Sequence, residues 1–176
     1  MKEVGTVKSP QFKAGVQVQG IRPCLVFKDR TNEAIELYVS IFNNSRVVEM
    51  VRAEANGPIP EGQVLSAIFE LDGREFRAFD GGPTFSFSEG MSLDVTCGTQ
   101  DEIDRVWDAL TADGGEEGPC GWLKDRFGVS WQIVPAELGK WLSDSKHGNT
   151  AKAMEAMLKM HKLEIPLLQQ AYGSGS

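Results

Sequence analysis

The segment of residues 125–135, which reads Asp-Arg-Phe-Gly-Val-Ser-Trp-Gln-Ile-Val-Pro, constrains the fold more than any other part of the chain. Asp125 and Gly128 are typical of a tight turn, because Asp accepts hydrogen bonds from its downstream backbone and Gly tolerates a positive φ. After the turn, residues alternate with a two-residue period that places Trp131 and Gln132 on opposite faces of a strand. The segment therefore predicts the second strand of a β-hairpin, ending at Pro135.

Composition narrows the class of protein. The chain has 176 residues, 41% of them hydrophobic, which predicts a single domain with one sizeable core. Its net charge of −7 argues against binding to nucleic acid or to anionic membranes. Three cysteines without a Cys-x-x-Cys pair indicate neither a disulfide framework nor a thiolate zinc site. Without an apolar run for a signal peptide or a membrane span, we expect a cytoplasmic protein.

The first half of the chain predicts a strand, a helix and then three strands. Strand patterns occupy residues 21–28, 47–52, 64–71 and 75–79. Helical spacing of apolar residues begins after residues 29–32 and ends near Asn43 and Asn44. Between the last two strands, Asp72 and Gly73 are one of the stronger short-range signals for a hairpin.

The second half predicts the same order of elements. A strand pattern at residues 91–97 precedes Thr99 and Glu102, whose spacing is that of a capping box at a helix start. Strand patterns at residues 121–124 and 129–134 then flank the turn at Asp125. The repeat predicts an α+β fold of two paired βαβββ modules, residues 21–83 and 90–135, within one domain of residues 21–135.

The two ends of the chain differ from this pattern. Residues 1–20 are expected to be a flexible N-terminal extension, and residues 173–176 a cloning remnant. Residues 136–172 predict a helical extension of the same domain, with a short helix, a longer helix capped by Asn149 or Thr150, and a last turn or two from residue 165. The longer helix is expected to carry Ala153, Met154, Met157, Leu158 and His161 on one side. Its Met-bearing surface either seals the domain's own sheet or meets a partner.

Two such modules that end in Asp-Arg-Phe-Gly-x-x-Trp-Gln resemble the vicinal oxygen chelate superfamily, which includes glyoxalase I, extradiol dioxygenases and bleomycin resistance proteins. Arg-Pro-Cys-Leu-Val-Phe from residue 22, Leu-Asp-Gly-Arg-Glu-Phe from residue 71 and the run of residues 120–135 resemble its PhnB-like group, often labelled 3-demethylubiquinone-9 3-methyltransferase-like. The resemblance implies a glyoxalase-like curved sheet, or half-barrel, around a cleft. It also implies a homodimer, the commonest soluble oligomer.

The same resemblance implies metal-ligand positions in the first and last strands of each module, typically filled by His and Glu. Here those positions hold Arg22 or Cys24, Arg77, Ser92 and Gln132. A guanidinium cannot ligate a cation, and Gln brings no charge. The two histidines, His147 and His161, lie in the tail. We therefore expect neither a bound transition metal nor a cofactor.

Strand parity places a mixed set of side chains on the face shared with Gln132. The set comprises Arg22, Cys24, Val26, Arg77, Phe79, Asp94, Thr96 and Ser130. Polar anchors beside an apolar wall are typical of a ligand site. The candidate ligand-binding residues are Arg22, Cys24, Arg77, Phe79, Asp94, Ser130 and Gln132. Alternatively, Arg77 and Asp94 pair across the sheet and Gln132 satisfies backbone groups.

Two residues of chemical interest are expected to be structural. Cys24 has no His in its own module to deprotonate it, so a buried structural thiol is expected rather than a nucleophile. Trp122 and Trp131 are both suited to stack on a planar ligand, but Trp131 falls on the face opposite Gln132 and is expected to pack under a helix instead.

The sequence predicts a metal-free protein that binds or sequesters a small polar or anionic molecule. One alternative is an enzyme that uses Asp94 with arginine anchors, or metal-assisted isomerase, lyase or dioxygenase chemistry. Another is a regulatory interaction domain without a ligand. The methyltransferase label finds no support in the residues, because no Gly-rich loop of the S-adenosylmethionine type joins a strand to a helix.

Overall fold

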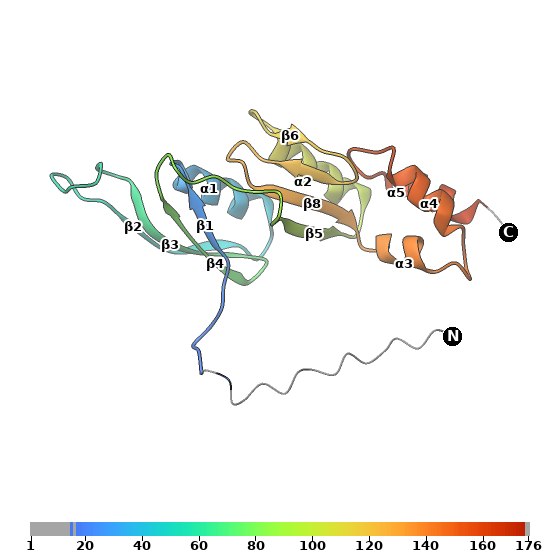
Figure 1. Ribbon diagram of the computed structural model, residues 1–176, viewed down its shortest axis with the longest axis horizontal. Coiled ribbons are helices and arrows are strands. Elements are labelled where there is room, and N and C mark those ends of the chain that lie inside the picture. Colours follow the sequence, from blue (N-terminus) through green and yellow to red (C-terminus); the bar gives the residue numbers. More distant parts are fainter. Residues whose placement is uncertain (1–14, 16, 175–176) are drawn as a thin grey trace.

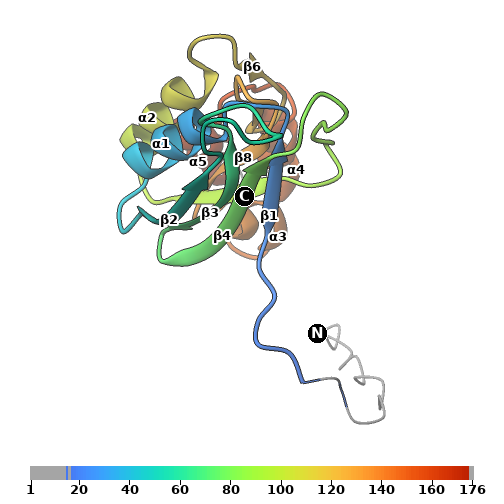
Figure 2. The same ribbon diagram turned by 90° about the vertical axis from the view of Figure 1, so that its left-hand side faces the viewer.

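Two four-stranded sheets follow one another along the long axis of the computed structural model, which describes residue 15 and residues 17–174 (Figure 1). The predicted N-terminal extension lies mostly outside these described residues, as do the last two residues of the predicted cloning remnant. Helices α1 and α2 lie on the same side of the two sheets, and the C-terminal helices occupy the far end of the molecule (Figures 1 and 2). None of the described helices is long and apolar enough to cross a membrane.

The first module has the predicted order of one strand, one helix and three strands. Its elements are β1 (Cys24–Phe27), α1 (Thr31–Ile41), β2 (Arg46–Arg52), β3 (Val64–Leu71) and β4 (Arg74–Asp80). The sheet order is β1-β4-β3-β2, with β1 parallel to β4. The first strand is shorter than predicted, because Pro23 has no N–H to donate and Ile21 is 93% exposed. Asp72 and Gly73 both adopt positive φ, which confirms the predicted hairpin.

The second module repeats this topology. Its elements are β5 (Leu93–Cys97), α2 (Gln100–Thr111), β6 (Glu116–Glu117), β7 (Trp122–Lys124) and β8 (Ser130–Pro135). The sheet order is β5-β8-β7-β6, with β5 parallel to β8. Two mixed sheets with equivalent strand orders confirm the predicted α+β fold of two βαβββ modules. The short strand β6 was not predicted, because two glutamates carry no strand periodicity.

The two helices begin in different ways. At α2, Thr99 accepts a hydrogen bond from Glu102 N, and the Glu102 side chain accepts from Thr99 N, which confirms the predicted capping box. At α1, Arg30 has left-handed φ and ψ and provides no side-chain cap. The carboxylate of Asp80, at the end of β4, instead accepts from Thr31 N at 3.0 Å and Thr31 Oγ1 at 2.6 Å. The start of α1 is therefore held by a residue almost fifty positions away in sequence.

Asp125 joins the two modules through a buried hydrogen-bond network. Asp125 is 3% exposed, and one carboxylate oxygen accepts from Tyr38 Oη at 2.6 Å and from Trp131 Nε1 at 2.9 Å. The other oxygen accepts from Phe127 N at 2.9 Å and Val129 N at 3.0 Å, as the turn prediction requires. Burial and the nearby carboxylate raise the pKa of Tyr38 well above its ordinary value. The Tyr38 phenol, from α1, therefore stays protonated and donates to the hairpin of the other module.

The C-terminal tail packs on its own second module. Its helices are α3 (Leu138–Ser143), α4 (Thr150–Met157) and α5 (Ile165–Gly173), and Asn149 caps α4 as predicted. Trp141, Ala153, Leu163, Leu168 and Tyr172 form a separate buried cluster. The extended segment after α4 lies along residues 120–121, with hydrogen bonds of 2.7 Å to the carbonyls of Met160 and His161. The prediction that Leu158 and His161 belong to the longer helix was wrong, because α4 ends at Met157.

Candidate functional site

The first sheet buries one face under α1 and leaves the other face open. On β1, Leu25 and Phe27 are buried whereas Cys24 is exposed, and on β4 Ala78 is buried whereas Arg77 is exposed. Cys24 and Arg77 are register partners in the parallel β1–β4 pair. We call the exposed side the open face of the first sheet. It carries Cys24, Val26, Arg77 and Phe79, which confirms their predicted parity.

The second sheet has the same two-sided organisation. Trp131 is register partner to both Leu93 and Leu123, and Trp131 is almost fully buried. It stacks on Phe42 and contacts Tyr38 edge-on, so it packs under α1 as expected. The opposite side is the open face of the second sheet. It carries Asp94, Thr96, Trp122, Lys124, Ser130 and Gln132, in the register Asp94–Gln132–Trp122 across three strands.

Arg22 and Arg77 form the basic part of the first open face. They line an open hollow of about 460 Å³ together with Gln19, Gly20 and Ile21. Arg22 forms an ion pair with Glu75, whereas Arg77 has no ion-pair partner within the described residues. An exposed guanidinium with free donors beside a hollow is suited to a carboxylate or another planar anion.

Cys24 differs from the sequence-based expectation. It was expected to be a buried thiol, but it is exposed, because its side chain points to the open face of the first sheet. Cys97 lies on β5, the edge strand of the second sheet that corresponds to β1, and its thiol is buried. Burial raises the pKa of the Cys97 thiol to about 11. The two cysteines therefore have opposite accessibility.

Gln132 donates a hydrogen bond of 2.7 Å from Nε2 to Ser92 Oγ. This contact differs from the alternative in which Gln132 satisfies backbone groups. The companion alternative, an Arg77–Asp94 pair, is also not observed, since neither side chain has an ion-pair partner in the described part of the chain. Ser130 lies next to Gln132 on β8 but is buried, and its Oγ has no hydrogen-bond partner among the described residues.

The residues at the metal-ligand positions of the superfamily do not fit a metal here. Arg77 offers only donors, and Gln132, whose Nε2 donates to Ser92 Oγ, offers a neutral carbonyl oxygen that brings no charge to a cation. Within residues 17–174, no three His, Cys, Asp or Glu side chains gather closely enough to hold a metal ion. His147 accompanies Asp144 in the tail, far along the chain from either sheet. The open faces thus carry hydrogen-bonding and charged side chains.

Two residues of the second open face were absent from the predicted set of ligand-binding residues: Trp122, which the sequence suggested only as a stacking surface, and Lys124, which it did not suggest. Trp122 is the register partner of Gln132, and Lys124 is the register partner of Ser130. Lys124 forms an ion pair with Glu89, which lies in the segment between β4 and β5. Trp122 and Lys124 both lie on β7, which has only three residues. A strand of this length has too few positions for the two-residue alternation to reveal which side chains share a face.

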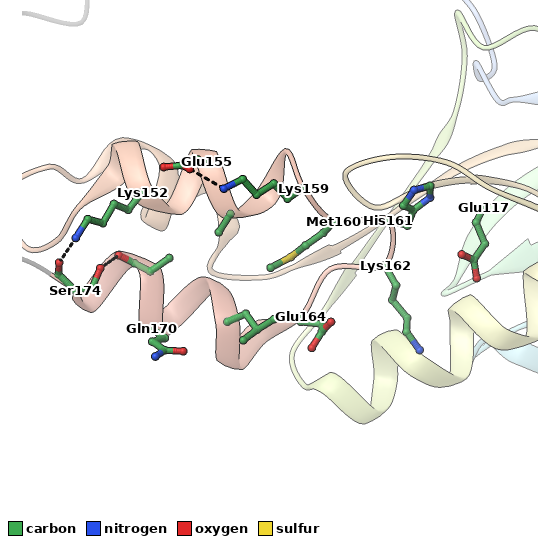
Figure 3. A pocket seen from close by; sticks show the side chains of 13 residues that line it. Glu117, Lys152, Glu155, Lys159, Met160, His161, Lys162, Glu164, Gln170 and Ser174 are labelled. Atoms are coloured by element: carbon green, nitrogen blue, oxygen red, sulfur yellow. Dashed lines mark hydrogen bonds and ion pairs between the residues drawn. The ribbon is translucent and has the colours of Figure 1, made fainter.

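A larger hollow of about 810 Å³ lies away from both open faces, between α4 and α5 (Figure 3). Its charged side chains mostly have partners. Lys159 pairs with Glu155, and Lys152 donates to the carbonyl of Ser174 (Figure 3). Lys162 pairs with Asp104. Because the charges of this hollow are mostly satisfied locally, we place the candidate site on the sheets.

Known proteins resemble this chain over most of its described length. Residues 19–134 match the family model for 3-demethylubiquinone-9 3-methyltransferase. The PhnB protein from Bacillus cereus is 39% identical, over 67% of this chain and 100% of that chain, with a TM-score of 0.62. Protein PA1353 from Pseudomonas aeruginosa is 22% identical, over 65% of this chain and 96% of that chain, with a TM-score of 0.54.

A more distant solved structure is a glyoxylase/bleomycin resistance protein/dioxygenase domain from Frankia sp. EAN1pec. It is 16% identical, over 68% of this chain and 93% of that chain, with a TM-score of 0.41. No curated protein sequence matches the chain. The matches confirm the predicted PhnB-like resemblance, and the helical tail from residue 136 lies beyond the residues that the family model matches.

Proposed function

Because the chain belongs to the 3-demethylubiquinone-9 3-methyltransferase family, whose glyoxalase-like fold presents two open sheet faces, we propose that it binds a small polar or anionic molecule there without a metal. The observation that carries the proposal is the Arg77 guanidinium, which is exposed beside a hollow and has no ion-pair partner in the described residues. Arginine binds carboxylate and phosphoryl groups through two parallel hydrogen bonds. Arg22, which is paired with Glu75, lines the same hollow.

The remaining candidates supply contacts of other kinds. Phe79 and Val26 are half-buried apolar groups on the same open face as Arg77. Gln132 offers neutral hydrogen bonds on the second sheet, and Trp122 beside it offers a flat apolar surface. Ligand sites commonly combine a few polar anchors with such apolar walls. We assign the ligand as a small organic molecule with at least one anionic or strongly polar end.

Binding is favoured over catalysis by the arrangement of titratable groups. Asp94 is the only carboxylate among the candidate residues, and it is exposed without a hydrogen-bond partner in the described part of the chain. General acid–base catalysis needs a positioned proton donor or acceptor, commonly one whose environment tunes its pKa. The chain thus provides anchors for a molecule rather than an organised catalytic pair.

Methyl transfer is not part of the proposal, despite the family name. Cofactors of the dinucleotide or adenosyl type bind where a Gly-rich loop leads from a strand into a helix. At the β1–α1 junction the residues are Lys28, Asp29 and Arg30, and the first backbone N–H of α1 is already bonded to Asp80. This junction therefore offers no backbone cradle for such a cofactor.

We further propose that the chain acts as a homodimer. Arg77 and Asp94 are both exposed in the single chain, whereas a ligand site normally buries most of its ligand. The first open face carries the Arg77 guanidinium and the second carries the Asp94 carboxylate, which are groups of opposite charge. A two-fold dimer that joins unlike faces would enclose both. Light scattering at micromolar concentration tests this, and a monomer there would contradict it.

Mass spectrometry of small molecules that co-purify with the native protein identifies the ligand, and calorimetry then measures its affinity. Arg77→Ala should weaken the affinity about 10- to 100-fold, because a hydrogen bond to a charged group contributes about 1.5–3 kcal/mol. Arg105→Ala is the matched control, since Arg105 is an exposed arginine on α2, on the other side of the sheets. Equal affinity in wild type and Arg77→Ala would remove Arg77 from the site.

A further inference from the structure

Lys124 is a cationic group on the open face of the second sheet. Lys124 lies directly opposite Ser130 in the β7–β8 register. The next pair along the two strands, Leu123 and Trp131, points to the other face and is buried in the core. Lys124 Nζ forms an ion pair with a carboxylate oxygen of Glu89. Glu89 belongs to the segment between the two sheets, so the ion pair links this segment to the open face.

Ser130 is the buried polar group at the same corner. It is 2% exposed, and its Oγ has no hydrogen-bond partner among the described residues. The segment that carries Glu89 lies close by, because Phe87 packs edge-on against Phe27 with 5.1 Å between ring centroids and borders Gly128 of the β7–β8 turn. A buried hydroxyl without a partner is unfavourable, so a water molecule or a ligand oxygen is expected to satisfy it.

We propose that Lys124 and Ser130 form an anion subsite for a carboxylate of the small-molecule ligand, and that this carboxylate displaces Glu89 from Lys124. The inference rests on the proposed function and narrows its ligand to a small organic acid. Glu89 supplies the chemical argument, because the group that Lys124 already holds is a carboxylate on a flexible side chain. Ser130 Oγ would donate to the second oxygen of the incoming group.

The charges around Lys124 are compatible with exchange. Glu116 is the register partner of Lys124 on β6, and hydrogen bonding to Glu89 followed by the charges of Glu89 and Glu116 raises the pKa of Lys124. Lys124 is therefore protonated at neutral pH. Both members of the Lys124–Glu89 pair are substantially exposed, and exposed ion pairs contribute little to stability. A purely structural ion pair would explain Lys124 but would leave the Ser130 hydroxyl without a partner.

Titration of the full-length, ¹⁵N-labelled chain with malonate, at constant ionic strength, tests the subsite. The indole N–H of Trp122 is the reporter, because Trp122 lies two residues from Lys124 on the same face of β7. Glu89→Gln should bind malonate about two- to fivefold more tightly than wild type, since it removes a weak competing ion pair. Lys124→Met should abolish the Trp122 response. Ser130→Ala should weaken binding, with the spectra of each variant showing that it is folded.

Glu155→Gln provides the matched control. It makes the same change in charge at another exposed pair, Glu155–Lys159 on α4, and should leave the Trp122 titration unchanged. Equal malonate affinity in wild type and Glu89→Gln, an unchanged titration in Lys124→Met, or no Trp122 response in any variant would each overturn the subsite. Arg77→Ala separates the two proposals. If it loses the co-purifying molecule while Lys124→Met retains both that molecule and malonate, the proposed function stands and the subsite does not.

Discussion

The open faces of the two sheets differ in chemistry although the two modules share one topology. Cys24 and Arg77 are register partners in the first sheet, and Asp94 and Gln132 are register partners at the equivalent place in the second. The first face therefore carries guanidinium groups, whereas the second carries Asp94 and Gln132 beside the cationic Lys124. The repeated βαβββ order therefore determines which positions of the chain face outward from each sheet. The residue type at each of these positions determines what the face can bind.

Each module contains an aspartate whose carboxylate accepts several hydrogen bonds, and the two aspartates connect different parts of the molecule. In the second module, Asp125 is buried and binds the indole of Trp131 and the phenol of Tyr38. In the first, Asp80 is half-buried and binds Thr31 and the backbone of Val64. One carboxylate thus connects two modules, whereas the other organises a single module. Substitutions at the two positions should therefore differ in cost.

The largest effect is expected from Asp125→Ala, which should lower the free energy of unfolding by about 3–5 kcal/mol. The substitution leaves the Tyr38 hydroxyl and the Trp131 indole as buried donors without their acceptor. Urea unfolding followed by tryptophan fluorescence measures it. Glu61→Ala, in the exposed loop between β2 and β3, is the control and should change stability by less than about 0.5 kcal/mol. A loss below about 1 kcal/mol for Asp125→Ala would show that the network does not join the modules.

The two sheets should also differ in thiol reactivity. At pH 8, Cys24 should react with iodoacetamide about 100-fold faster than Cys97, because Cys24 is exposed while Cys97 is buried with a pKa of about 11. Peptide mapping by mass spectrometry gives both rates. Because burial raises the pKa of Cys97, its labelling should increase as the pH rises toward 11. Comparable rates at pH 8 would contradict the difference in burial, and Cys24→Ser serves as the control for peptide assignment.

A smaller loss, about 2 kcal/mol, is expected for Asp80→Ala. Its carboxylate accepts from Thr31 N, from Thr31 Oγ1 and, at 2.9 Å, from Val64 N. Urea unfolding gives the change in stability, and hydrogen exchange should show faster exchange at the start of α1. Asp80→Asn retains one acceptor oxygen and should give an intermediate loss. Unchanged exchange in α1 with Asp80→Ala would mean that another group holds the helix start.

The smallest effect is expected from Thr99→Ala at the start of α2, about 1 kcal/mol. The substitution removes the acceptor for Glu102 N, whereas Thr99→Ser retains it and should be close to wild type. Thermal unfolding monitored by circular dichroism compares the two variants. Equal melting temperatures for the alanine and serine variants would show that the capping box adds nothing measurable to the second module.

Local sequence patterns predicted much of the fold for a clear physical reason. The strand at residues 64–71 was predicted at its observed bounds, and the capping box of Thr99 and Glu102 was predicted residue by residue. Side chains alternate across a strand, so parity alone was enough to place Arg77 on the same side of its sheet as Cys24, and Gln132 on the same side as Asp94. The exposure of Cys24 was not predicted, because parity tells which face a residue occupies but not whether anything covers that face.

The sequence by itself therefore determined the order of elements, the turns and the faces, since each depends on neighbouring residues and on backbone geometry. Only the tertiary structure decided which distant residues meet. Tyr38 reaches Asp125 across 87 positions, Glu89 reaches Lys124 from the segment between the sheets, and the tail packs on the second module. Such contacts depend on how whole elements pack against each other, and no local periodicity carries that information.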